Sequence, residues 1–317
     1  MRILVTGGAG FIGSNLVDKL LALGHQVVVI DNLSRGKEEN LEQARKQQQS
    51  FSFYKMDIRE KGIKEVMAHR RPEAIMHLAA QVSVRESVVD PAYDADVNIL
   101  GTLNLLQASV NCGAKKFIFA SSGGAIYAEP QYLPVDEKHL QQPLSPYGVS
   151  KKVIDDYLIF FRSSYGLLYT SLALSNVYGP RQDPYGEAGV VAIFIGQMLE
   201  GRIPTINGDG EQVRDFLCVD DAVEAFVLAL EKSSEGLYNI GTGTATSVNQ
   251  LFEKLSTFTS FAGQAKYGPP KAGEMRRIYL DSQKAQRELG WQARISLEEG
   301  LMKTIAFFQE RAKRQGS

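Results

Sequence analysis

Cysteine is scarce in this sequence: only Cys112 and Cys218 occur among 317 residues. Two cysteines form neither a disulfide framework nor a thiolate metal site, so they indicate packing residues of a protein from a reducing compartment. Histidine is almost as rare. The four histidines are far apart and make no ligand pattern with acidic residues, so we expect no metal.

Long apolar runs and an excess of one charge are missing as well. No window approaches the roughly 18 uncharged residues that a membrane-spanning helix needs. The first residues show no signal-peptide pattern, so we expect a cytoplasmic protein without a membrane partner. The formal net charge of -1 argues against nucleic acid as a partner, because proteins that bind it usually carry a basic excess.

Short apolar runs alternate with longer segments of helical period through the first half of the chain. Continuous apolar runs are typical of strands that are covered on both faces. The runs occupy 3–6, 27–30, 51–55, 74–78, 116–120 and 169–174, and the main helical patterns 11–23, 63–69, 90–111 and 147–165. This order predicts an α/β fold with a doubly wound parallel (Rossmann) sheet, whose strands end at one ligand-binding rim.

Beyond about Pro180 the pattern becomes irregular, with five helical segments separated by loops rich in glycine and proline. We expect residues 1–180 to form the sheet domain and residues 181–317 a smaller mixed α/β lobe folded over its rim. No linker marks the boundary, so the chain can cross back from one part to the other.

A glycine-rich loop, GGAGFIG, follows the first predicted strand and opens the first helix. Gly7 permits a tight turn, Gly10 lets the backbone approach a pyrophosphate, and Gly13 lets helix and strand pack closely. The pyrophosphate would meet the free N–H groups of the helix. At the end of the second strand, Asp31 can bind ribose hydroxyls and repel a 2′-phosphate, which favours NAD over NADP. Arg35 is the opposing signal, because an arginine there can accommodate that phosphate.

Tyr147 and Lys151 are four residues apart at the start of a predicted helix, so their side chains share one face. A nearby cation favours phenolate over phenol. We therefore expect Lys151 to lower the pKa of Tyr147 towards neutrality and make it a useful base. The pair alone is weak evidence, since tyrosine and lysine occur at this spacing in many chains.

Together these motifs resemble the extended short-chain dehydrogenase/reductase superfamily, most closely its nucleotide-sugar epimerases of the UDP-glucose 4-epimerase type. The resemblance spans nearly the whole chain, through TGGAGFIG (6–13), DNL (31–33), MDI (56–58), HLAAQ (77–81), Asn98, SSGG (121–124), YGVSK (147–151), NVYGPR (176–181), GDG (208–210) and RDF (214–216). It implies an NAD-dependent isomerase that inverts C4 of a UDP-hexose, UDP-glucose or UDP-galactose foremost, through a transient 4-keto sugar.

The resemblance also implies a role for each matching residue. Tyr147 would be the base, Lys151 would tune it, and Ser122, with Ser121 as the alternative, would bind the reacting hydroxyl. The implied NAD contacts are Gly7, Gly10, Phe11, Ile12, Gly13, Asp31, Asn32, Arg35, Gly36, Asp57, Ile58, Leu78, Ala79, Ala80, Gln81, Asn98, Tyr147 and Lys151. The implied substrate contacts are Ser83, Ser122, Tyr147, Asn176, Val190, Val191, Arg214, Lys271 and Glu274, with Arg181 either a further contact or a salt-bridge partner between the lobes.

Related reactions leave different signatures in the loop after the reactive serine. Dehydratases of the superfamily carry an acid/base pair there, whereas this chain has Gly123 and Gly124, which cannot transfer protons. Dehydration is therefore disfavoured. Ala128 replaces the glycine that commonly follows the tyrosine of this loop, a small departure from the pattern.

Other substrates and one other class of protein stay open. Ile278 stands where some relatives have a bulky tyrosine, and the smaller side chain would admit an N-acetyl group. UDP-glucuronate is a further alternative, with Ser83 and Arg85 as candidate contacts to C6. A non-catalytic dinucleotide-binding sensor would typically have lost Tyr147 or Lys151, and this chain has both.

Two helices have apolar faces larger than one sheet surface needs. They are the predicted helices at 90–111 and 147–165. In the resembling family the corresponding helices pair across a dimer as a four-helix bundle, so we expect a homodimer through them.

Overall fold

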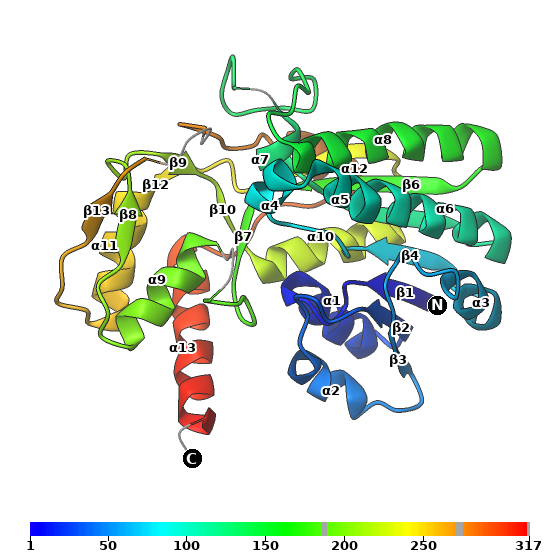
Figure 1. Cartoon of the computed structure of the whole chain (residues 1–317), viewed down its shortest axis with the longest axis horizontal. Coiled ribbons are helices and arrows are strands. Elements are labelled where there is room, and N and C mark those ends of the chain that lie inside the picture. Colours follow the sequence, from blue (N-terminus) through cyan, green and yellow to red (C-terminus); the bar gives the residue numbers. More distant parts are fainter. Residues whose placement is uncertain (128, 186–188, 271–274, 316–317) are drawn as a thin grey trace.

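A seven-stranded sheet, in which every neighbouring pair is parallel, forms the centre of the molecule (Figure 1). The computed structural model describes residues 1–127, 129–185, 189–270 and 275–315. The strand order is β11-β6-β5-β4-β1-β2-β3. The strands are β1 (Arg2–Thr6), β2 (Gln26–Asp31), β3 (Phe51–Lys55), β4 (Ala74–His77), β5 (Lys116–Ser122), β6 (Leu168–Leu174) and β11 (Gly236–Ile240). The predicted doubly wound sheet is confirmed, and its order reverses between β1 and β4, where such folds bind ligands.

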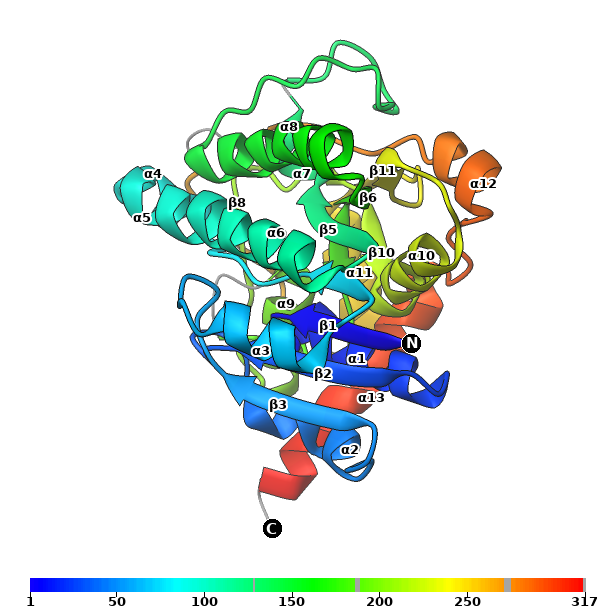
Figure 2. The same ribbon diagram turned by 90° about the vertical axis from the view of Figure 1, so that its right-hand side faces the viewer.

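Helices cover both faces of this sheet because its strands present apolar side chains alternately to each side. Ile3 and Val5 pack towards the side that holds Leu16 of α1 and Phe226 of α10, whereas Leu4 packs towards the opposite side. The first face carries α1 (Phe11–Ala22), the short α2 (Glu42–Arg45), α10 (Val219–Glu231) and α12 (Gln283–Leu289). The second carries α3 (Ile63–Arg70), α6 (Gly101–Cys112) and α8 (Pro146–Tyr165), with α6 and α8 side by side in Figure 2.

The predicted helix at 90–111 is found, but it is interrupted. It consists of α5 (Pro91–Ala95), a π-helical turn at Asp96–Leu100 and then α6. Helix α4 (Val84–Val89) precedes it and a 3-10 turn, Glu38–Leu41, precedes α2. No helix in the described part of the chain is long and apolar enough to cross a membrane.

The second half of the chain builds a smaller mixed α/β lobe, seen on the left of Figure 1. Helices α9 (Val190–Leu199), α11 (Val248–Thr259) and α13 (Leu297–Gln315) enclose a separate apolar core with Phe194, Leu251 and Leu301 at its centre. Three two-stranded pairs complete it: β7 (Asn176–Tyr178) with β10 (Phe216–Cys218), β8 (Thr205–Asn207) with β13 (Lys266–Gly268), and β9 (Val213–Arg214) with β12 (Thr246–Ser247).

The chain returns to the central sheet after residue 180. Strand β11 pairs with β6 along its whole length, from Gly236 opposite Thr170 to Ile240 opposite Leu174. Helix α10 also packs on α1, the first helix of the chain. The sequence pattern does not predict this strand, because the run GLYNI is short and contains an asparagine.

Candidate active site

The glycine-rich loop has the close contacts that its residues permit. Gly7 has a φ of 70°, and a Cβ there would lie 2.6 Å from the backbone nitrogen of Ala79. A Cβ on Gly13 would lie 2.1 Å from the Gly7 carbonyl oxygen, so helix α1 rests directly on the loop. Gly10 is the N-cap residue of α1 and carries no side chain that could bond the first-turn N–H groups. This cradle suits a pyrophosphate, which binds to backbone N–H groups at a helix start.

Asp31 connects this loop to the one that follows β2. Its carboxylate accepts hydrogen bonds from the backbone N–H groups of Ala9, at 2.9 Å, and Leu33, at 2.8 Å. Burial raises the pKa of Asp31. Arg35 is engaged elsewhere, since its guanidinium donates to Glu86 of α4 at 2.8 Å. An acidic Asp31 with an ion-paired Arg35 favours a free ribose 2′-hydroxyl over a 2′-phosphate.

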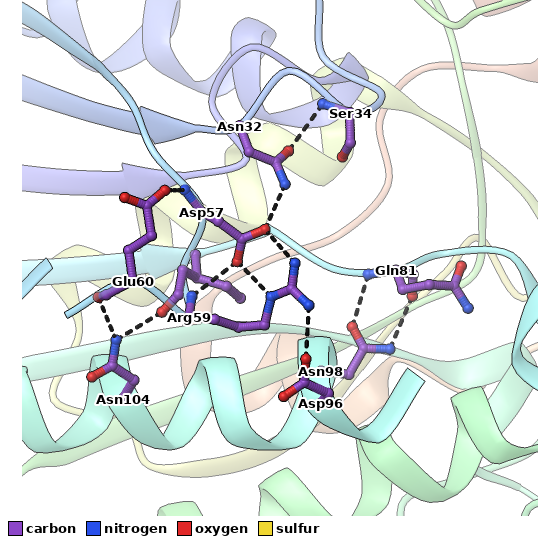
Figure 3. Close-up of polar contacts among 10 residues, drawn as sticks. Asn32, Ser34, Asp57, Arg59, Glu60, Gln81, Asp96, Asn98 and Asn104 are labelled. Carbon is purple, nitrogen blue, oxygen red and sulfur yellow. Dashed lines mark hydrogen bonds and ion pairs between the residues drawn. The ribbon is translucent and has the colours of Figure 1, made fainter. Parts of the chain in front are cut away.

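Asp57 lies in a loop held on several sides (Figure 3). Arg59 donates to both oxygens of Asp57 at 2.8 Å and to Asp96 at 2.7 Å. Asn32 donates to the same carboxylate at 2.8 Å. The Arg59 hydrogen bond lowers the pKa of Asp57 to about 2. Asn104 donates to the carbonyl groups of Ile58 and Glu60, so side chains from three segments fix the backbone around Ile58.

The π-helical turn places Asn98 against the segment that follows β4. Its side chain accepts from the backbone N–H of Gln81 at 2.8 Å and donates to the Gln81 carbonyl at 3.0 Å (Figure 3). Asp94 accepts from Asn98 and from the Gln81 side chain, both at 3.0 Å, and from the Ser150 hydroxyl at 2.6 Å. This buried network ties residues 78–81 to α8. Ser83 is buried beside it as the N-cap of α4.

Tyr147 and Lys151 occupy the first turns of α8, which begins after Ser145, whose hydroxyl accepts from Gly148 N–H. The Lys151 ammonium donates to the Ala120 carbonyl at 2.8 Å and lies 5.6 Å from the centre of the Tyr147 ring. The Ser122 hydroxyl, at the end of β5, lies close enough to the Tyr147 phenol to lower its pKa. Ser121 does not take this place, because its hydroxyl is buried and has no partner in the described part of the chain.

The pKa values of the pair differ from the expectation. Burial raises the pKa of Tyr147 to about 12, the Ser122 hydrogen bond lowers it, and the negative charge of Asp94 raises it. The predicted lowering towards neutrality is therefore wrong for the chain by itself, because desolvation of the phenolate outweighs the effect of Ser122 that favours it. Burial likewise lowers the pKa of Lys151 to about 8, while Asp155 and Asp94 raise it.

His77 is a packing residue at this rim. Its ring nitrogens lie 2.7 Å from the Thr6 hydroxyl and 2.8 Å from the Thr102 hydroxyl. Burial, and then the charge of Lys151, lower its pKa to about 3, so the ring is neutral. Within the described ranges no three His, Cys, Asp or Glu side chains are grouped as metal ligands would be.

The expected substrate residues of the second lobe lie in different surroundings. Asn176 and Arg214 come from paired segments of the second lobe, the first exposed and the second half-buried. Val191 is buried in the core of that lobe, whereas Val190 is only partly covered. Ala128, Lys271 and Glu274 lie outside the described residues. Arg181 is the salt-bridge partner that one of the two interpretations predicted, since its guanidinium contacts Asp18 of α1 at 2.5 Å.

Asp215, for which the sequence predicts no role, joins three segments next to Arg214. This buried carboxylate accepts from the hydroxyl and N–H of Thr242, at 2.6 and 2.9 Å, and from the N–H of Leu280 at 3.2 Å. It thereby fixes the backbone next to Arg214. The RDF motif marks the position, but motif and spacing do not reveal which distant segments it joins.

The fold and the rim geometry define an NAD-binding enzyme of the extended short-chain dehydrogenase/reductase type, and comparison with known proteins gives its family. Residues 4–304 match the family described as GDP-mannose 4,6 dehydratase. The chain belongs to this family. The UDP-glucose 4-epimerase of Mycolicibacterium smegmatis is 45% identical over 314 residues, which cover 99% of this chain and 100% of that protein.

Two solved structures resemble the whole chain. The UDP-glucose 4-epimerase of Thermotoga maritima, solved with UDP-glucose, is 50% identical and superposes with a TM-score of 0.95, covering 98% of this chain and 100% of that one. The UDP-glucose 4-epimerase of Thermus thermophilus, solved with NAD, is 42% identical with a TM-score of 0.91, covering 98% and 99%.

Proposed function

We propose that this protein is an NAD-dependent 4-epimerase of UDP-hexoses, with UDP-glucose and UDP-galactose as its substrate pair. The observation that carries the proposal is the contact of Ser122 with Tyr147 beside the Lys151 ammonium, at the rim where the glycine-rich loop also ends. The relatives named as UDP-glucose 4-epimerases, matched over nearly their full length, support the same reaction.

We assign the NAD site to the cradle of Gly7, Gly10 and Gly13 with the backbone that follows them, Phe11 and Ile12. Asp31 would bind the adenosine ribose, and the loops at Asn32–Gly36, Asp57–Ile58 and Leu78–Gln81 would line the cofactor, with Asn98 holding the last of these. When bound, NAD would take a hydride from C4 of the sugar and return it to the other face.

Three side chains would handle the proton of that reaction. Tyr147 would remove the proton from the C4 hydroxyl and later give it back, while Ser122 orients that hydroxyl. Lys151 would hold the nicotinamide ribose and supply positive charge. The chain alone leaves the pKa of Tyr147 near 12, so the base also needs the positive charge of an oxidised nicotinamide.

Dehydration is disfavoured on chemical grounds, because neither Gly123 nor Gly124 carries an acid. A Cβ on Gly123 would lie 2.5 Å from a terminal carbon of the Leu280 side chain. The space at Gly124 is open, yet glycine has no group that transfers a proton. The 4-keto sugar would therefore be reduced and not dehydrated.

We assign substrate binding to the second lobe and the rim of the first. Asn176 and Arg214 would bind the diphosphate, Val190 and Val191 would flank the base, and Ser83 would face the sugar. Arginine suits this role because its planar fork matches phosphate oxygens. Lys271 and Glu274 complete the proposed set. In this assignment residues 1–180 carry the cofactor and residues 181–317 mainly the nucleotide sugar.

We also propose a cytoplasmic homodimer that serves galactose metabolism. The helical run 91–112 and helix α8 expose large apolar side chains, among them Leu100, Ile159 and Phe160, each at least half exposed. Apolar area of this kind on adjacent helices is typical of a protein interface. Ile278 is buried in a cluster with Tyr127 and Leu280. UDP-N-acetylglucosamine is a second substrate to test because Ile278 is smaller than the tyrosine of some relatives.

The purified protein should convert UDP-galactose into UDP-glucose without added NAD, as followed by NMR of the C4 proton. Tyr147→Phe removes only the ionisable hydroxyl and should abolish nearly all turnover, whereas a sensor would keep its function. Tyr157→Phe, on the exposed side of the same helix, is the matched control and should retain full activity. Conversion at the wild-type rate by Tyr147→Phe contradicts the proposal. A panel with UDP-N-acetylglucosamine and UDP-glucuronate would settle the substrate range.

A further inference from the structure

The π-helical turn at Asp96–Leu100 has a geometry that helices rarely adopt. The N–H of Gly101 bonds to the Asp96 carbonyl, five residues earlier, so the turn contains one residue more than an α-helical turn does. Turns of this kind occur frequently at functional sites. This one carries Asn98 at its centre, where the side chain bonds to both backbone groups of Gln81. Asn98 has a role in the proposed function, whereas the turn that carries it has none yet.

The loop of residues 57–60 holds this turn at both ends. At the start of the turn, the Arg59 guanidinium donates to the Asp96 carboxylate at 2.7 Å (Figure 3). At the other end, a Cβ on Gly101 would lie 2.7 Å from the terminal carbon of Ile58, so the Ile58 side chain lies directly on the backbone there. Two neighbouring residues of one loop therefore clamp the turn from both ends.

The carboxylate of Asp96 is separate from the groups that would touch NAD. Arg59 also donates to Asp57, which belongs to a loop that would line the cofactor, whereas Asp96 begins the π-helical turn and is not among the proposed contacts. The side chains of Arg59 and Asp96 are 34% and 47% exposed, and ion pairs of this exposure add little to global stability. A local effect of Asp96 can therefore be measured without loss of the fold.

Two contacts lead from this ion pair to the segment after β4. Asp96 begins the turn, and Asn98 accepts from the Gln81 N–H at 2.8 Å and donates to the Gln81 carbonyl at 3.0 Å (Figure 3). Asp94 accepts from the Asn98 side chain and from a hydroxyl of α8. The turn is thus fixed to α8 by a buried carboxylate and to the loop of residues 57–60 by a partly exposed ion pair. Loss of the ion pair would release it on one side only.

We propose that Asp96 is a positioning residue of the cofactor site, whose ion pair with Arg59 sets the π-helical turn so that Asn98 holds the backbone of Gln81 in place. Asp96 acts through the turn and touches neither sugar nor cofactor. The expected effect on turnover rests on the proposed function, in which Leu78–Gln81 would line NAD. The effect on the Gln81 backbone can be measured without any substrate.

The test compares Asp96→Ala with Glu235→Ala in the protein loaded with NAD. Glu235 is the matched control, because it forms an ion pair with Arg162 near the far end of α8, and these side chains are 28% and 42% exposed. Amide hydrogen exchange of residues 78–83 is followed by mass spectrometry. Exchange there should quicken about fivefold in Asp96→Ala, because the segment opens more often when one of its supports is lost. It should keep the wild-type rate in Glu235→Ala.

Turnover gives the second measurement. With the cofactor segment less well held, kcat for UDP-galactose should fall about fivefold in Asp96→Ala, because catalysis depends on exact placement of the reacting groups. The KM should stay unchanged, since the proposed sugar contacts are intact. Asp96→Asn keeps an oxygen within reach of the guanidinium but loses the charge, so it should lie between Asp96→Ala and the wild type in both measurements.

Unchanged exchange of residues 78–83 in Asp96→Ala would overturn the inference. Faster exchange throughout the chain together with a lower unfolding temperature would also overturn it, because that pattern marks a residue of purely structural importance. If the wild type turns over no nucleotide sugar, the proposed function fails, and the exchange measurement still decides the role of Asp96. If Asp96→Ala does not fold, Asp96→Asn is subjected to the same two measurements and the same criteria.

Discussion

The ionisation of single residues at this site depends on two opposing effects, burial and nearby charge. Burial raises the pKa of Tyr147 to about 12 and lowers that of Lys151 to about 8, so each is shifted away from its charged form. The phenolate and ammonium needed for proton transfer must therefore be stabilised together. In the proposed function, the positive charge of an oxidised nicotinamide would favour the phenolate form of Tyr147.

The close packing at the glycine-rich loop predicts that a single added methyl group will disturb it. A Cβ on Gly13 would meet the Gly7 carbonyl at 2.1 Å, so Gly13→Ala forces backbone movement. Such overpacking typically costs about 1–3 kcal/mol, and we expect the purified variant to lose most of its bound NAD. Cofactor content by absorbance and unfolding by calorimetry are the measurements. Gly62→Ala is the control, because its Cβ would meet only the flexible end of Met56. Full retention of NAD by Gly13→Ala would refute this reading of the loop.

At the scale of helices and loops, helix α1 and the segment at residues 180–181 join the two lobes. Arg181 has a φ of 73° and reaches back to Asp18 on α1. Asn15, one turn earlier on the same helix, donates to the Pro180 carbonyl at 3.1 Å. Helix α1 thus contacts the glycine-rich loop at its start and the beginning of the second lobe along its length.

Removing the ion pair between Arg181 and Asp18 should weaken sugar binding more than cofactor binding. Arg181→Met keeps apolar bulk but loses a largely buried, charged hydrogen bond, which is worth about 1.5–3 kcal/mol. We expect a lower unfolding temperature and a higher KM for UDP-galactose, with NAD still bound. Arg202→Met breaks an ion pair with Glu200 whose side chains are half exposed, and exposed pairs contribute about 0–1 kcal/mol. Equal behaviour of the two variants would argue against a link between the lobes.

At the scale of the whole molecule, one apolar face on α8 is left exposed by the part of the chain that the structure describes. Phe160 on α8 is half exposed and stacks edge-on against Phe161 and Tyr165. In the proposed homodimer this face is buried, so Phe160→Asp places a charge in the interface. We expect monomers by analytical ultracentrifugation. Met302→Asp, which changes an equally exposed apolar side chain on α13, should stay dimeric. A wild type that is monomeric at micromolar concentration would refute the dimer itself.

Much of the fold could be predicted because its signals are local. The glycine loop, the buried strands and the helical periods each depend on a few neighbouring residues, and six strands and their helices lie within a few residues of the predicted ranges. Strand β11 and the joints made by Asp215 and Asp94 depend on contacts between distant segments, which no local pattern records. The pKa of Tyr147 was misjudged for a similar reason, since burial is a property of the whole site.

The return of the chain to the sheet at β11 also bears on the order of events during synthesis. The edge of β6 cannot be paired until residues 236–240 have left the ribosome, although the glycine loop and Tyr147 emerge much earlier. The unpaired edge of a parallel sheet is a site of aggregation in incomplete chains. A nascent chain that stops near residue 180 would therefore contain the predicted cofactor loops and yet lack the strand that closes its sheet.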